Sequence, residues 1–172
     1  MTTIVVPSVG DVTDPETIQQ IHDDVVALES DVATLQTDVG KMVRVNTTTR
    51  TSNSGTFTAE TVLDTVAASL VSGRTYVVTF RGHVQSSVAD GYVRGRIRED
   101  NISGTERMID QVPTTAAASQ AFPLVMQFEY TASATASKTF AATAQRQVGT
   151  GNITATAAAT APTYLTVDYL SG

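Results

Sequence analysis

Residues 75–84 read TYVVTFRGHV, and Tyr76, Val78, Phe80 and Val84 share one alternating set of positions in this stretch. A period of two predicts a β-strand with one buried face, because successive side chains of a strand point to opposite faces of its sheet. The same alternation recurs in residues 122–130 and 165–169.

Turn-forming residues separate these segments at short intervals, at 52–55, 72–73, 90–91, 100–104, 113, 149–152 and 162. This spacing predicts about eight or nine strands, and therefore a mainly β chain whose residues 43–172 form an antiparallel β-sandwich or jelly roll. Residues 131–161 are rich in Ala, Thr and Ser and could be read as a linker. Their alternation of small apolar residues with Thr favours two lean strands instead.

Apolar residues before this region follow a different period, with alternating steps of three and four. They are Ile18, Ile21, Val25, Leu28, Val32, Leu35, Val39 and Met42. This pattern predicts a short coiled-coil stalk over residues 15–42, with Asp14 as N-cap, Pro15 at the first helical position and Gly40 ending the helix. We call the eight apolar residues from Ile18 to Met42 the apolar seam. Polar residues flank it, so we expect the helix to pack against copies of itself rather than against its own chain.

The number of strands in this coil stays open from the core residues alone. Val and Leu at most seam positions favour a dimer, whereas the Ile18 and Ile21 layer favours a trimer.

Charge is divided unevenly along the chain, which has a net charge of −6. The first 40 residues hold eight acidic side chains and no Lys or Arg, while the remainder hold nine acids and eleven bases. The acidic stalk could dock against a basic surface of a larger assembly, or its charges could simply keep it in solution. Residues 1–14 would form an extended anchoring arm in which Ile4, Val5, Val6 and Val9 are buried by a partner, the alternative being a frayed terminus.

Composition argues against several classes of protein. The chain has no cysteine and two histidines far apart, which predicts neither a metal site nor a thiol nucleophile, and no cofactor motif occurs. We read no active site and expect a non-enzymatic protein. No stretch is apolar enough for a membrane helix, the N-terminus does not read as a signal peptide, and the acidic balance argues against nucleic-acid binding.

Three arginines, Arg94, Arg96 and Arg98, alternate along one predicted strand and so share a face. They could bind a glycan or a phosphate. A hairpin turning at residues 100–104 would instead set Arg98 opposite Glu106 and Arg94 opposite Asp110, leaving Arg96 as the unpaired cation. We favour the structural interpretation.

An acidic arm, a heptad stalk and a sandwich containing SGRTYVVTF (72–80) and PTYLTVDYL (162–170) resemble the small virion proteins of tailed phages that infect actinobacteria. Such proteins occur as head decorations, head fibres or minor tail proteins. The resemblance implies a head similar to tumour necrosis factor-like jelly rolls, a homotrimer, a phage capsid or tail protein as partner, and assembly into the virion in the host cytoplasm. The favoured function is capsid decoration, and the alternative is a minor tail or tail-fibre protein that recognises a host-surface glycan.

Overall fold

The computed structural model describes residues 15–38, 42–114 and 118–170, with side chains in the helix only as far as Ser30. The chain divides into two units, a helical segment and a compact unit that spans Met42–Leu170. The arm predicted for residues 1–14, with Ile4, Val5, Val6 and Val9, lies outside the described residues, and so do Asp14, Val39 and Gly40.

Helix α1 spans Pro15–Asp38 and confirms the helix predicted to start at Pro15. Gln19 donates a hydrogen bond to Asp23 one turn later, and Gln20 does the same to Asp24. Such pairs add a few tenths of a kcal/mol to an exposed helix. The stalk prediction placed Met42 at the end of the helical seam, and this part of the prediction is wrong. Met42 is the first residue of strand β1 and pairs with Leu170, and the β-branched Val43 and Val45 that follow it favour a strand.

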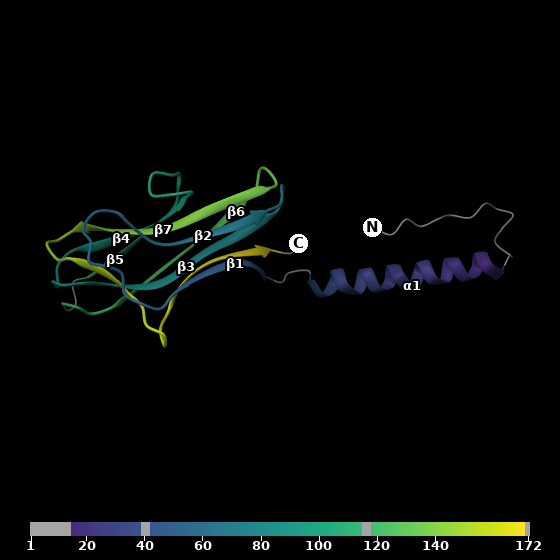
Figure 1. Cartoon of the computed structure of the whole chain (residues 1–172), viewed down its shortest axis with the longest axis horizontal. Helices are drawn as coiled ribbons and strands as arrows, with labels where there is room; N and C mark the ends of the chain where they lie inside the picture. Colours follow the sequence, from purple (N-terminus) through teal and green to yellow (C-terminus); the bar gives the residue numbers. More distant parts are fainter. Residues whose placement is uncertain (1–14, 39–41, 115–117, 171–172) are drawn as a thin grey trace. The chain divides into compact units, whose positions relative to one another are not determined.

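The described residues contain nine strands, arranged in two antiparallel layers (Figure 1). Sheet A holds β1 (Met42–Arg50), β9 (Thr163–Leu170), β3 (Thr75–Ser86) and β6 (Phe122–Thr131) in that order, and the short β8 (Ile153–Thr156) also pairs with β3. Sheet B holds β2 (Thr61–Leu70), β7 (Ala136–Val148), β4 (Tyr92–Glu99) and β5 (Glu106–Pro113).

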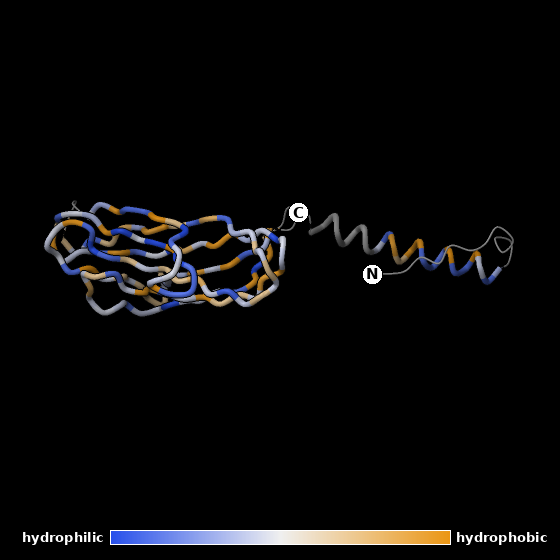
Figure 2. Tube along the Cα trace, turned by 90° about the horizontal axis from the view of Figure 1, so that it is seen from above, coloured by the Kyte–Doolittle hydropathy of each residue, from blue (hydrophilic) through white to orange (hydrophobic). Residues whose placement is uncertain are grey.

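Apart from β8, this strand order is that of a jelly roll, in which two Greek keys wind together and each sheet takes strands from both. The prediction of an antiparallel sandwich or jelly roll is therefore confirmed. Residues 131–161 do form two strands, β7 and β8, and not a linker. Figure 2 shows the alternation of apolar and polar positions along the strands that drives this fold.

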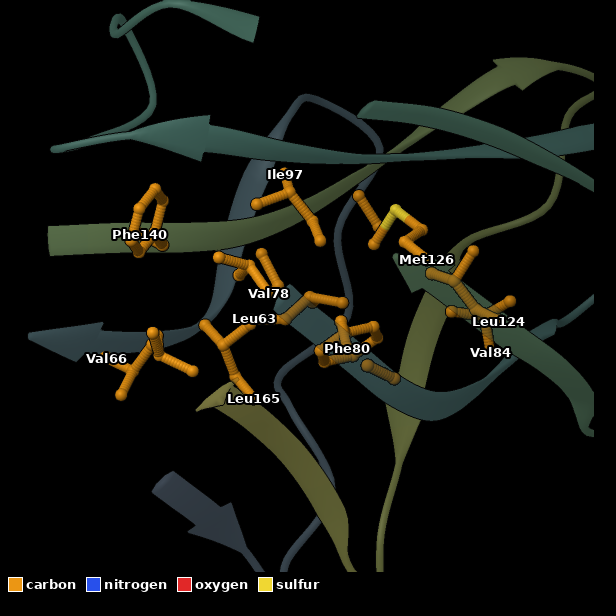
Figure 3. Close-up of a cluster of buried hydrophobic side chains, with 14 of the residues drawn as sticks. Leu63, Val66, Val78, Phe80, Val84, Ile97, Leu124, Met126, Phe140 and Leu165 are labelled. Atoms are coloured by element: carbon orange, nitrogen blue, oxygen red, sulfur yellow. The ribbon is translucent and has the colours of Figure 1, made fainter. Parts of the chain in front are cut away.

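The inward faces of the two sheets form one core (Figure 3). Sheet A contributes Phe80, Leu124 and Leu165, and sheet B contributes Ile97 and Phe140, all fully buried. The sheets approach closely at Gly95, where a Cβ atom would lie 2.7 Å from a methyl carbon of Leu124. A core of this kind accounts for the stability of the unit without disulfides.

Side chains of β1 close one open edge of the sandwich. The Asn46 amide donates a hydrogen bond to the carbonyl of Ala67, and the Thr48 hydroxyl donates to that of Thr65, each at 2.6 Å. Both acceptors belong to β2, so the edge strands of the two sheets are tied together and covered against edge-to-edge pairing. No helix in the described ranges is both long enough and apolar enough to cross a membrane.

Candidate functional site

The described part of the apolar seam is exposed within a single chain. Ile18, Val25 and Leu28 are each between 46% and 53% exposed, and Ile21 is partly buried. Val32 and Leu35 belong to α1, but their side chains lie beyond the described part of the helix. In a coiled coil, the single helix carries a strip of half-exposed large aliphatic residues at heptad spacing, which association with other helices buries.

Arg94, Arg96 and Arg98 share the outer face of β4, as the alternation predicted. Arg98 lies opposite Glu106, also as predicted. Arg94, however, lies opposite Gln111 and not Asp110, so that part of the prediction is wrong. The register shifts between Ile97 and Arg98, because Arg107 is an extra residue on β5 and turns to an ion pair with Glu99.

Arg96 is not the unpaired cation that the sequence suggested. Its side chain is 8% exposed, its Nε atom lies 2.7 Å from a carboxylate oxygen of Glu106, and its Nη1 atom lies 3.2 Å from Glu60. Among the residues described, Arg94 is the member of the triplet with no ion pair. Arg96 is therefore the paired residue and Arg94 the unpaired one, the reverse of the prediction.

Glu60 organises this group, and we call Glu60, Arg96, Arg98 and Glu106 the charge cluster. The Arg98 guanidinium donates to both carboxylate oxygens of Glu60, at 2.7 and 3.1 Å, and the Thr143 hydroxyl donates to the same carboxylate at 2.6 Å. Burial by itself would raise the pKa of Glu60. The hydrogen bonds from Arg98 and Thr143 and the positive charges of Arg96 and Arg98 outweigh burial, so the pKa lies below its ordinary value.

The charges of the cluster are paired with one another, although the buried Nε atom of Arg96 makes no hydrogen bond of good geometry, so the cluster offers little to a ligand. Two carboxylates face two guanidinium groups, and the bidentate Arg98–Glu60 pair is the strongest geometry available to such ions. Sequence reasoning missed Glu60 because it precedes β2 and lies 38 residues from Arg98 along the chain, with no local motif to connect them. The favoured structural interpretation of Arg96 and Arg98 agrees with these contacts.

A second ionic group surrounds Glu99 at the end of β4. Arg107 and Lys138 both form ion pairs with its carboxylate, and Lys138 also lies 3.0 Å from Asp100. Burial would raise the pKa of Glu99, but the hydrogen bonds and charges of Lys138 and Arg107 outweigh it and hold the pKa below its ordinary value. A carboxylate held ionised by two cations does not serve as a general acid.

No group of three or more His, Cys, Asp or Glu residues in the described parts of the chain is placed to hold a metal ion.

The outer face of sheet A carries a hollow that sequence reasoning did not find. It has a volume of about 490 Å³ and is lined by Met42, Arg44, Thr79, Arg81, Gln127, Tyr164, Thr166 and Asp168. We call it the polar hollow. Its residues come from four adjacent strands, β1, β9, β3 and β6, and are brought together by the ladders that pair Thr166 with Thr79 and Thr79 with Gln127.

The two ends of the polar hollow differ in charge. At one end Arg44 forms a short ion pair with Asp168, whose other carboxylate oxygen accepts a hydrogen bond of 3.1 Å from the Thr166 hydroxyl. At the other end Tyr164 lies beside Arg81 across the β9–β3 ladder. The alternation of β3 and β9 indicates which residues face outward, but it does not indicate which strands become neighbours, so the sequence alone could not assemble this site.

Comparison with known proteins gives no family. No family model matches the chain, and no curated protein matches it. Among solved structures, it is similar to one described as "CBM4 structure and function", with 18% identity and a TM-score of 0.32 over 61% of this chain and 59% of the other.

Two further structures are similar over longer stretches. The CBM22-1 xylan-binding domain from Paenibacillus barcinonensis Xyn10C matches at 10% identity and a TM-score of 0.34, over 78% of this chain and 98% of the other. The structure of infectious bursal disease virus, Gt strain, matches at 12% identity and a TM-score of 0.32, over 75% and 37%. At such TM-scores these likenesses assign no function to the chain.

Proposed function

We propose that this chain is a non-enzymatic, self-associating structural protein of a phage particle, of the capsid-decoration type. The observation that carries the proposal is that the described part of the apolar seam is half-exposed, whereas the jelly roll closes its own core. A helix with an apolar strip at heptad spacing associates in order to bury it. A β unit that needs no partner for its own stability is suited to display.

The assembly we propose is a parallel homotrimer, with a dimer as the alternative. Residues 1–14 would attach the oligomer to a capsid protein, with Ile4, Val5, Val6 and Val9 buried at that contact. We assign the protein to a phage particle because of its sequence resemblance to phage virion proteins. The acidic N-terminal region would favour a basic docking surface.

Self-association is tested with two matched substitutions in α1. Leu28 lies in the seam and Val26 outside it, and the two are equally exposed within one chain, at 47% and 50%. Leu28→Asp places a charge in the seam and should lower the oligomer mass in sedimentation equilibrium, whereas Val26→Asp should leave it unchanged. A wild-type monomer at micromolar concentration, or equal effects of the two substitutions, would refute the coiled coil.

Attachment is tested by deleting residues 1–14 and mixing the truncated protein with particles that lack it. We expect a folded oligomer that no longer binds, and wild-type binding that weakens as salt rises because exposed charges are screened over about 8 Å at physiological ionic strength. Full occupancy by the truncated protein would place the attachment site elsewhere in the chain. Binding confined to tails would favour the receptor-binding alternative.

A further inference from the structure

We propose that the polar hollow on the outer face of sheet A binds a short saccharide that carries an acidic group. This inference goes beyond the proposed structural role and rests on sheet A alone. It holds whether or not the chain belongs to a particle.

The shape of the polar hollow suits a small polar ligand. Its volume of about 490 Å³ lies inside the range of roughly 300–1,000 Å³ that is usual for small-molecule sites. Its floor is built by Thr79 and Thr166, which are nearly buried although they lie on the outer face. Because both stand on paired strands in the middle of a sheet, the floor is rigid and formed in advance of binding.

The side chains around that floor hold hydrogen-bonding groups that the protein does not use. Within the described part of the chain, no side-chain hydrogen bond or ion pair is found for Arg81, Gln127 or Tyr164. A planar amide and a guanidinium group can each bind two neighbouring hydroxyl groups of a sugar ring. The Tyr164 ring, which is 40% exposed, presents a flat apolar surface with a polar tip, on which the C–H face of a sugar can pack.

The balance of charge selects an acidic ligand over a neutral one. Two arginines and one aspartate line the polar hollow. Asp168 is taken up by Arg44, so Arg81 at the other end keeps an uncompensated positive charge. Glu129 lies two residues beyond Gln127 on the same face of β6, but it is not among the lining residues. A carboxylate or phosphate group on the saccharide would therefore pair with Arg81.

The same features argue against other ligands. One free cation is too little for a nucleic acid, whose affinity comes from contacts to several phosphates. Two threonines, two arginines, a glutamine and an aspartate also make the lining too polar for a lipid or a helix face.

The test is a binding screen of the full-length protein on an array of acidic and neutral oligosaccharides, followed by calorimetric titration of the best acidic binder and its neutral counterpart. We expect an acidic oligosaccharide with a Kd below about 1 mM. Removal of its acidic group should weaken binding at least about fivefold, as the loss of one charge-assisted contact predicts. Absence of any binder on the array would overturn the proposal, and equal affinity for the neutral counterpart would overturn its acidic part.

Matched variants assign the site. Tyr164→Ala and Arg81→Gln should each weaken binding about tenfold or more. Their controls are Tyr92→Ala and Arg94→Gln, which change the same residue types on the outer face of sheet B, where Tyr92 is 44% exposed. Unchanged thermal unfolding of all four variants shows that the fold is intact. Loss of binding in the Arg94 variant with retention in the Arg81 variant would place the ligand on the other sheet and refute the polar hollow.

Discussion

Replacing Glu60 by Gln tests whether the charge cluster contributes to stability. The substitution keeps the size of the side chain and one acceptor oxygen, but it removes the negative charge shared by Arg96 and Arg98. The Glu60 carboxylate accepts two hydrogen bonds from Arg98 and one from Thr143, and it lies 3.2 Å from Arg96. Arg96 cannot turn to solvent, since its side chain is 8% exposed.

The size of the effect follows from these contacts. Removing one partner of a fully buried ion pair costs about 3–5 kcal/mol. Glu60 itself is 17% exposed, and Glu106 remains as a second counter-charge at 2.7 Å from Arg96, so the cost should be smaller. We expect a loss of about 2 kcal/mol in the free energy of unfolding, equivalent to a fall in Tm of about 8 °C for a domain of this size.

The dependence on pH gives the prediction a second readout. A carboxylate with a lowered pKa in the folded state stabilises the protein above its ordinary pKa, 4.5 for Glu60, and loses this contribution as pH falls through the folded-state pKa. The difference in stability between wild type and Glu60→Gln should therefore be constant near neutral pH and shrink below about pH 4.5.

Denaturant unfolding measures both quantities, and Glu129→Gln is the matched control. It makes the same change at an exposed position of β6 that has no ion pair with any described residue. The control should change the stability by no more than about 0.5 kcal/mol. A similarly small effect of Glu60→Gln, or a difference that grows as pH falls, would show that the charge cluster does not stabilise the fold.

Three further predictions concern the core, a turn and a buried carboxylate. Phe80→Ala should lower the free energy of unfolding by about 3–5 kcal/mol in a denaturant titration, because the ring is fully buried between the sheets. Gly91→Ala should lower the free energy of unfolding by more than about 2 kcal/mol, since Gly91 has a φ of 93° and a Cβ atom would lie 2.0 Å from the Val148 carbonyl oxygen. Its control is Gly55→Ala, where a Cβ atom would meet nothing within 4 Å, and this substitution should change the free energy of unfolding by less than about 1 kcal/mol. Burial raises the pKa of Asp64, and its contacts with Thr163 and Arg50 offset this only in part. Ionising it therefore costs the native state stability, so Asp64→Asn should gain stability relative to wild type as pH rises from about 3 to 7.

Most of the fold could be predicted because the strands obey a period of two. Every large apolar residue that the alternation placed inward on β3 is buried, from Tyr76 to Val84. Local turn signals also marked most of the strand boundaries, but none marked the turn between β6 and β7, and Pro113 is the last residue of β5 and not part of a turn. The stalk boundary failed at Met42 because one apolar residue fits both a heptad position and the start of a strand, and only its pairing with Leu170 decides between them.

The sites could be predicted only where neighbours in sequence are neighbours in space. The side-by-side placement of Arg96 and Arg98 on one face followed from alternation within a single strand. Their partner Glu60 comes from a distant segment, and the bulge at Arg107 moved Arg94 away from Asp110. A one-residue insertion of this kind leaves no clear mark in the sequence, yet it changes every pairing beyond it.

The two outer faces of the jelly roll therefore differ in what they leave available. On sheet B the small residues of β7, such as Ala141 and Thr143, leave room for Arg96 and Arg98 to lie flat and pair with Glu60 and Glu106, and the buried Nε atom of the unpaired Arg94 faces no carboxylate of the described residues. On sheet A the threonines of the central strands leave a depression, and the polar side chains at one end of it meet no partner from the protein. Recognition needs groups that are held in place but not yet satisfied, because only these gain hydrogen bonds when a ligand arrives. For this reason we place ligand binding on sheet A, although the sequence draws attention to the arginines of sheet B.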